Sequence, residues 1–157
     1  MINIQIIGGK ETVASLEAGA AKIQGSIGSA LESWAAQLAS YIKASKLSGD
    51  PLHRRSGNLS ASVHPIIGST TDSVFGGAGA GLGLAYAAIH EYGGWVRARV
   101  AINAKALMIP LPTGVIFRKS ARGFQMPERS YMRSSLSERA PSGIEAIRAA
   151  IKEAIIA

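Results

Sequence analysis

The sequence predicts an α+β fold, in which a long N-terminal helix and a C-terminal helix pack on a mostly antiparallel sheet of about four or five strands. Apolar residues recur at steps of three and four from about residue 11 to residue 48, which is the period of an amphipathic helix. Isoleucines at the same steps mark a second helix over residues 143–156. The segments between them are short, β-branched or alternating, and bounded by Gly and Pro, as strands and turns are.

Turn-forming residues set the limits of the individual elements. Residues 2–7 (INIQII) predict a short strand, and Gly49-Asp50-Pro51 ends the long helix, because proline disfavours helix in the residue before it. Ser142 and Glu145 have the spacing of a capping box for the last helix. The other elements expected are two strands within residues 63–77, a short helix or extended segment at 84–92, strands at 95–102, 106–111 and 115–118, and a helix within 130–139. Since the chain has 157 residues and neither a repeat nor a linker, we expect a single domain over residues 1–157.

The long helix has two candidate partners for its apolar face. The simpler one is the sheet of the same subunit. The other is a neighbouring subunit, because Gly19, Gly25 and Gly28 permit close approach of another backbone. Aromatic residues are only 6% of the chain, so the core is thin and favours a subunit that completes its burial with neighbours. Residues 76–83 (GGAGAGLG) are expected to be a mobile loop.

Composition limits the compartment and the partners. The chain has no cysteine, which excludes disulfides and thiolate metal sites. No signal peptide pattern and no apolar run of roughly 18 residues is present, so we expect a soluble protein made in a cytoplasm, with no membrane partner. The net charge is +7, and residues 96–139 hold nine Lys and Arg against Glu128 and Glu138. Such a block indicates a polyanion, an acidic protein or a charged ring surface as partner.

The sequence contains no pattern that predicts an enzyme, a cofactor or a metal site. Gly79, Gly81 and Gly83 give G-x-G-x-G, with Leu84 at the place of the third glycine of a dinucleotide fingerprint. The three histidines are scattered, and the carboxylates form no pair suited to acid–base catalysis. A serine nucleophile would need an elbow such as G-x-S-x-G, which residues 68–72 do not supply.

The basic segment is the strongest candidate for binding. Arg97 and Arg99 are two residues apart, so on a strand they share one face, while Val96, Ala98 and Val100 face the core. Three further candidates for an interface or a DNA channel follow at Arg118, Lys119 and Arg122. Four aromatic residues lie among them, at Trp95, Phe117, Phe124 and Tyr131. Basic residues with interspersed aromatics fit nucleic-acid binding, and a solvated sheet face with aromatics in the core remains an equal alternative.

Three motifs in this order resemble a phage protein family. Arg55-Ser56-Gly57-Asn58-Leu59, followed by Ser62-Val63, is similar to R-T/S-G-x-L-x-x-S-I/V. Residues 86–93 (YAAIHEYG) are similar to Y-A-x-x-x-E-F/Y-G, and residues 126–136 (MPERSYMRSSL) to I-P-A-R-P-F-L-R-x-x-L. Residues 105–111 (KALMIPL) are similar to a K-A-L-x-I/F-P strand of Mu-like members. The family comprises the tail-component, neck or tail-completion proteins of long-tailed phages and the related virion-morphogenesis proteins.

The resemblance covers residues 55–136 and implies a non-enzymatic virion protein. Such a protein forms a ring of identical copies, for which a hexamer is one candidate, at the head–tail junction, and it is assembled in the host cytoplasm. Its expected partners are head connector or stopper proteins, tail tube or terminator proteins, and DNA passing through the ring. One alternative is a tail terminator that caps the tube. The sequence separates the neck protein from the tail terminator poorly. The alternative from another class is a free basic nucleic-acid-binding protein.

The resemblance also selects residues for structural roles. The motif residues that match are Arg55, Gly57, Leu59, Tyr86, Glu91, Gly93, Pro127, Arg129 and Tyr131. Gly57 would let the chain reverse, and Leu59 and Val63, one turn apart, would dock on the core. Glu91 would pair with Arg55 or Arg129, or stand exposed at a sharp turn. Tyr131 would anchor the last segment to the core.

Overall fold

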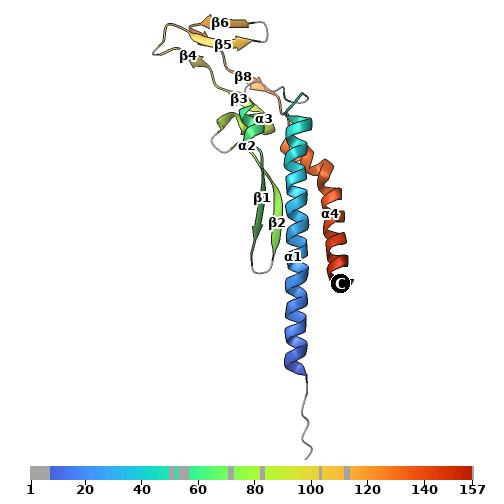
Figure 1. Cartoon of the computed structure of the whole chain (residues 1–157). Helices are drawn as coiled ribbons and strands as arrows, with labels where there is room; N and C mark the ends of the chain where they lie inside the picture. The colour runs from blue at the N-terminus through green and yellow to red at the C-terminus, as the bar shows by residue number, and fades with distance from the viewer. Residues whose placement is uncertain are drawn as a thin grey trace, which may run out of the picture.

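The chain is built around one long helix, α1 (Gly9–Tyr41), which continues into a π-helical turn, η1 (Ile42–Lys46). The computed structural model describes residues 8–49, 52, 57–70, 73–81, 84–102, 104–111 and 114–156. Helix α4 (Met132–Ile156) runs antiparallel along one side of α1 (Figure 1). The hairpin of β1 (His64–Ser69) and β2 (Val74–Gly79) packs along another side. Helix α1 is therefore the spine of an elongated molecule.

The core forms around the C-terminal half of α1, where these elements meet. The buried residues are Leu31, Trp34, Leu38, Ala39 and Ile42, together with Leu47, Leu52, Val63 and Tyr131. Leu31, Trp34 and Leu38 are three and four residues apart along α1, so they form one apolar stripe that faces the hairpin and α4. The stripe begins earlier, but there Val13 is 55% exposed and Leu16 is 69% exposed. In Figure 1 this first part of α1 extends past both neighbours, so the described parts of the subunit do not cover its apolar side chains.

A glycine lets α4 approach α1 closely. A Cβ atom placed on Gly143 would lie 2.7 Å from Cε2 of Trp34, so the indole ring occupies the space that a side chain would fill. The ring nitrogen of Trp34 donates a hydrogen bond to the carbonyl of Arg139 over 3.1 Å. Trp34 therefore joins the two helices by packing and by a polar contact.

The second half of the chain forms a long β ribbon that leaves the body. After α2 (Asn58–Ser62) and α3 (Ala85–Tyr92), the ribbon is built from β3 (Gly94–Val96), β4 (Arg99–Val100), β5 (Leu107–Leu111), β6 (Gly114–Arg118), β7 (Ser120–Ala121) and β8 (Phe124–Met126). Strand β3 pairs with β8, β4 with β7, and β5 with β6, all antiparallel. We call residues 94–126 the arm and its β5–β6 part the outer hairpin. Figure 1 shows the outer hairpin at the end of the molecule opposite the start of α1.

The α+β class, the two terminal helices and the antiparallel pairing are confirmed, but the strands do not join in one sheet. The described strands form four two-stranded sheets, where the sequence predicts a sheet of about four or five strands. The pairs of the arm are nested, with Gly94 opposite Met126 and Arg99 opposite Ala121. Successive pairs therefore follow one another along a single ribbon, and no third strand lies beside them in the described residues.

The expectation of a mobile loop at residues 76–83 is wrong for its first half. Gly76, Gly77 and Gly79 belong to β2 and pair with β1, while residues 82 and 83 lie outside the described residues. A Cβ atom on Gly76 would lie 3.3 Å from Cβ of Leu31 in α1, and one on Gly79 would lie 2.4 Å from Cδ1 of Ile66. Gly76 and Gly79 therefore make room for neighbouring side chains and serve close packing rather than mobility.

The two C-terminal segments predicted as separate helices are one helix, α4. The predicted capping box is therefore wrong, because Ser142 lies inside α4 and its hydroxyl donates to the carbonyl of Arg139 over 2.7 Å. Glu145 instead pairs with Arg148, three residues later. Residues 84–92 are helical as α3, and the predicted strand over residues 95–102 is interrupted between β3 and β4. The strand predicted at residues 2–7 lies outside the described residues.

Candidate functional site

The motif around Glu91 and the motif that begins at Met126 meet where α3 ends and α4 begins. Helix α3 stops at Gly93, which has a φ of 68°, a conformation that favours glycine. A Cβ atom on Gly93 would lie 2.8 Å from the backbone nitrogen of Glu128. The backbone N–H of Arg129 donates to the carbonyl of His90 over 2.9 Å. The missing side chain of Gly93 thus lets the chain before α4 pass close beside the end of α3.

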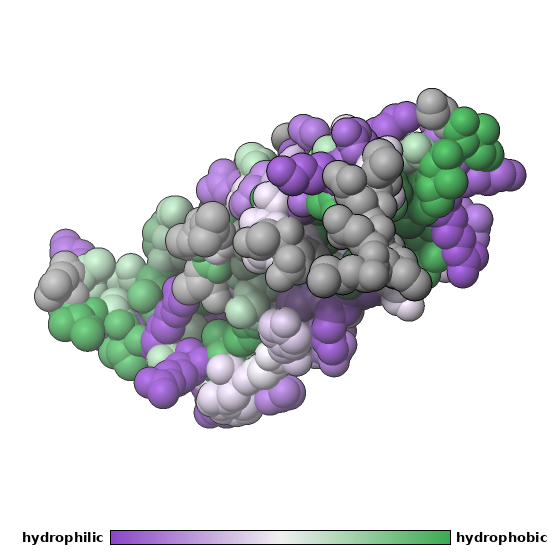
Figure 2. All heavy atoms as spheres, turned by 90° about the horizontal axis from the view of Figure 1, so that it is seen from below, coloured by the Kyte–Doolittle hydropathy of each residue, from purple (hydrophilic) through white to green (hydrophobic). Residues whose placement is uncertain are grey.

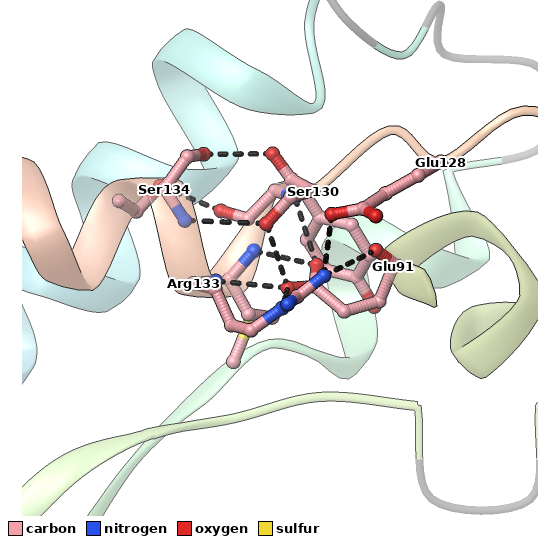
Figure 3. Close-up of polar contacts among 8 residues, drawn as sticks. Glu91, Glu128, Ser130, Arg133 and Ser134 are labelled. Atoms are coloured by element: carbon pink, nitrogen blue, oxygen red, sulfur yellow. Dashed lines mark hydrogen bonds and ion pairs between the residues drawn. The ribbon is translucent and has the colours of Figure 1, made fainter. Parts of the chain in front are cut away.

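Glu91 caps the first turn of α4 from the end of α3, as Figure 3 shows. One oxygen, Oε2, accepts hydrogen bonds from the backbone N–H groups of Tyr131 and Met132 over 2.8 and 2.9 Å. The other, Oε1, accepts from the backbone N–H of Arg133 and the hydroxyl of Ser130, each over 2.9 Å. The first N–H groups of a helix lack partners within the helix and carry partial positive charge. A carboxylate from a distant part of the chain therefore satisfies them; we call this contact the Glu91 cap.

The Glu91 cap is buried and ionised. Glu91 is 4% exposed. Burial raises the pKa of its carboxyl, but the hydrogen bonds from Met132, Arg133, Tyr131 and Ser130 together lower that pKa below its ordinary value. The Nε of Arg133 adds an ion pair to Oε1 over 3.2 Å.

The environment of the Glu91 cap indicates a structural role. Both carboxylate oxygens accept hydrogen bonds from this chain, which leaves little room for a substrate or an ion. Within the described residues, no group of three or more His, Cys, Asp and Glu gathers as a metal site. The Glu91 cap fixes α3 and the base of the arm to the start of α4.

The partner of Glu91 differs from the prediction. The side chain pairs with Arg133, whereas the sequence suggests Arg55, Arg129 or an exposed position. Arg55 lies outside the described residues, and Arg129 contributes its backbone N–H to His90 instead. The sequence does not show the role of Ser130 and Arg133 in holding and completing this cap. A serine just before a helical segment is a capping signal, but no sequence pattern shows that a carboxylate 39 residues earlier completes the cap.

The remaining motif residues divide between the core and the surface. Tyr131 is 2% exposed and lies in the core, as predicted, and burial, followed by the charge of Glu91, raises its pKa to about 12. Leu59 packs against the core, and Val63 is buried. Gly57 precedes α2 with a φ of 78°, a backbone conformation that favours glycine. Two further motif residues are exposed: Pro127, and Tyr86, whose ring meets that of His90 edge-to-face.

The predicted basic residues lie on the arm. The exposed members are Arg97, Arg99, Arg118, Lys119 and Arg122. The expectation that Val96, Ala98 and Val100 face the core is wrong, since Ala98 is exposed and Val100 is 64% exposed. The reason is that the arm stands away from the body, so neither face of this stretch reaches the core. Trp95, Phe117 and Phe124 are also exposed, by 63, 68 and 50%.

The comparisons with known proteins give no match. No family model, curated protein or solved structure matches the chain. Across the described ranges, no helix is both long and apolar enough to cross a membrane.

Proposed function

We propose that the chain is a non-enzymatic structural protein of a tailed bacteriophage, a neck or tail-completion protein that forms a ring at the head–tail junction. In this role it binds head connector or stopper proteins on one side and tail tube or terminator proteins on the other. DNA passes through the ring, and basic residues of the arm are the candidates to face it.

The Glu91 cap is the observation that carries the proposal. Residues 86–93 and residues 126–136 resemble two motifs of the same phage family, and the 32 residues from 94 to 125 separate them in the sequence. The glutamate of the first motif caps the helix of the second, and Gly93 lets the two segments touch. Motif residues that form one structural unit support a shared fold better than short matches that lie apart.

The distribution of apolar side chains also supports a subunit of a larger assembly. Large apolar residues of the arm and of the first part of α1 are at least half exposed, among them Val13, Leu16, Ile102, Met108, Val115 and Phe117. Met108, Val115 and Phe117 share one face of the outer hairpin, and an exposed apolar patch of this kind marks a site of association. A ring of identical copies would cover this surface.

Electron microscopy of labelled particles tests the proposed function. The chain is tagged at its C-terminus in the phage that encodes it, and purified virions are labelled with gold against the tag. We expect label at the junction of head and tail, and particles grown without the gene should show separate heads and tails. Tails of abnormal length in that deletion would instead favour the tail terminator. Virions without label would overturn a structural role.

A free nucleic-acid-binding protein is the second candidate, because the arm combines exposed basic residues with exposed aromatic rings. Trp95 and Phe124 are at least half exposed near Arg97 and Arg122, and stacking on aromatic side chains is a sequence-tolerant way to bind bases. A titration of the purified protein with generic DNA at several salt concentrations decides between the two. Tight binding that weakens steeply with salt favours this candidate.

A further inference from the structure

Both faces of the outer hairpin are apolar. Met108 lies opposite Phe117 in the register of β5 and β6, and these side chains are 66 and 68% exposed. Val115, two residues before Phe117 and therefore on the same face, is 51% exposed. Ile109 and Ile116 form a cross-strand pair on the opposite face. A two-stranded ribbon that exposes this much apolar surface is marginally stable at best in water, so the outer hairpin needs a cover.

The chemistry of the outer hairpin fits a protein rather than a nucleic acid. Residues 106–117 (ALMIPLPTGVIF) contain no charged side chain, whereas binding to a phosphate backbone depends on Lys and Arg. The six basic residues of the arm flank this stretch, at Arg97, Arg99, Lys105, Arg118, Lys119 and Arg122, and the arm contains neither Asp nor Glu. Its partner should offer an apolar surface with negative charge beside it. In Figure 2 hydrophobic residues gather at the left, where the arm lies, with hydrophilic residues next to them.

The beginning of α1 offers a surface of that kind. Every residue from Gly8 to Ala18 is exposed, and Val13 and Leu16 continue the stripe that is buried further along the helix. Glu17 lies one turn after Val13 and so beside the stripe. Residues 9–20 carry Glu11 and Glu17 against Lys10, a net charge of −1 in a chain of net charge +7, and this sign is opposite to that of the arm. We call residues 9–20 the free end of α1.

The two surfaces cannot meet within one subunit. Figure 1 places the outer hairpin at one end of the long axis and the free end of α1 at the other. Two complementary surfaces at opposite ends of one molecule produce a head-to-tail contact between copies, and such contacts close into rings or extend into filaments. The position of the surfaces thus favours a second copy of this chain over a contact of the arm with itself.

We propose that the outer hairpin of one copy docks on the free end of α1 of the next copy. Met108 and Phe117 cover Val13 and Leu16, and the basic residues that flank the outer hairpin lie toward the acidic residues of α1. The inference deepens the proposed function, on which its biological setting rests, by naming the two surfaces that join the copies.

Two variants of the full chain test the contact. Phe117→Asp places a charge on the outer hairpin, and Leu16→Asp places one on the free end of α1. Both side chains are exposed, so neither change disturbs the core, and equal melting temperatures verify this. Light scattering after size-exclusion chromatography should show oligomers for the wild type and monomers for each variant. A wild type that stays monomeric at high concentration overturns the proposal, and so does either folded variant that still assembles.

An equal mixture of the two variants gives the sharpest result. The Phe117→Asp copy keeps an intact free end of α1, and the Leu16→Asp copy keeps an intact outer hairpin, so one contact can form between them and no second one can follow. We expect a one-to-one dimer that grows no further. A mixture that remains monomeric would refute head-to-tail docking, because this docking leaves one intact contact between the two variants. An arm-to-arm contact instead fails in every pairing that includes the Phe117→Asp copy.

A matched control and a separate readout complete the design. Ile155 in α4 is 67% exposed, close to the 68% of Phe117, and Ile155→Asp should assemble like the wild type. Loss of assembly in this control would show that any added charge has the effect, and would overturn the specific contact. Assembly in solution is independent of gold labelling of virions. Oligomers that join by this contact but are absent from particles would refute the proposed function alone.

Discussion

The body and the extensions of this chain use the same kinds of side chain with opposite results. In the body, the apolar stripe of α1 from Leu31 to Ile42 is buried against α4 and the β1–β2 hairpin. In the free end of α1 and in the arm, comparable residues such as Leu16 and Phe117 are more than 60% exposed. An apolar pattern therefore identifies the residues that require a partner, but it does not tell whether that partner belongs to the same chain.

Removal of the Glu91 carboxylate should give the largest effect on the body. Glu91→Ala leaves without an acceptor the buried backbone N–H of Tyr131 and the partly buried N–H groups of Met132 and Arg133. We expect a loss of roughly 3 kcal/mol in the free energy of unfolding, measured by urea denaturation. Glu138→Ala is the control, because that exposed carboxylate contacts the side chains of Tyr41 and Lys46 and its loss should matter much less. Equal losses in the two variants would show that the Glu91 cap contributes no more to stability than an exposed carboxylate does.

The same carboxylate should make the stability depend on acid. The pKa of Glu91 is lowered in the folded chain, so its contribution is complete above the unfolded pKa of about 4.3 and is lost as the pH falls through the folded value. The pKa of Glu138 is also lowered, by the side chains of Lys46 and Tyr41, and adds a loss in the same direction. We expect the wild type to lose stability below about pH 4.3, and Glu91→Gln to flatten this dependence. An identical pH profile for Glu91→Gln would exclude Glu91 as the source.

A smaller effect is expected at Gly57, which has a φ of 78° before α2. A β-branched residue is strained in this region of backbone space, so Gly57→Val should cost about 1–3 kcal/mol in the free energy of unfolding. Gly25 lies within α1, and a Cβ atom placed on it would meet nothing within 4 Å. Gly25→Val should therefore change stability by less than about 0.5 kcal/mol. Thermal melts of the two variants check this, and similar melting temperatures would contradict the argument.

The helices could be predicted from the periodicity of apolar residues, whereas the arrangement of the strands depends on strand pairing, which the sequence does not show. The steps of three and four place the stripe of α1 correctly, because an amphipathic pattern depends only on neighbouring turns. The prediction of two separate helices in place of α4 is wrong because Pro141, which lies between the two predicted segments, is inside the helix and does not end it. The single sheet is an error of another kind, because short strands show which segments extend but not which segments become neighbours.

The candidate site was predictable as a set of residues but not as a geometry. The resemblance selected Glu91, Gly93 and Tyr131, and the structure brings them together at the start of α4. It does not indicate Arg133 as the partner of Glu91, because a sequence motif does not show which of several arginines lies beside the carboxylate. Likewise, alternation at residues 95–100 predicted a buried face, which fails at Ala98 and Val100 because a sequence pattern does not tell whether a ribbon lies on the body or leaves it.

The smallest effect on stability is expected in the arm, at Arg97 and Arg99. Both side chains are exposed, and exposed charges contribute little to folding, so changing both to Ser should cost less than about 1 kcal/mol. The change removes two positive charges from each copy, and a ring multiplies this loss by its number of subunits. The variant should therefore fold normally and yet assemble poorly, or give particles that retain DNA weakly.

Melting of the purified double variant, followed by complementation of a phage that lacks the gene, separates these effects. Arg148→Ser with Lys152→Ser removes the same charge from α4, away from the arm, and should complement as well as the wild type. A large fall in the melting temperature of the Arg97 and Arg99 variant would show that these residues hold the fold. Full infectivity at normal stability would show that they form only a solvated surface. The difference between body and arm would then lie in the exposure of their apolar residues alone.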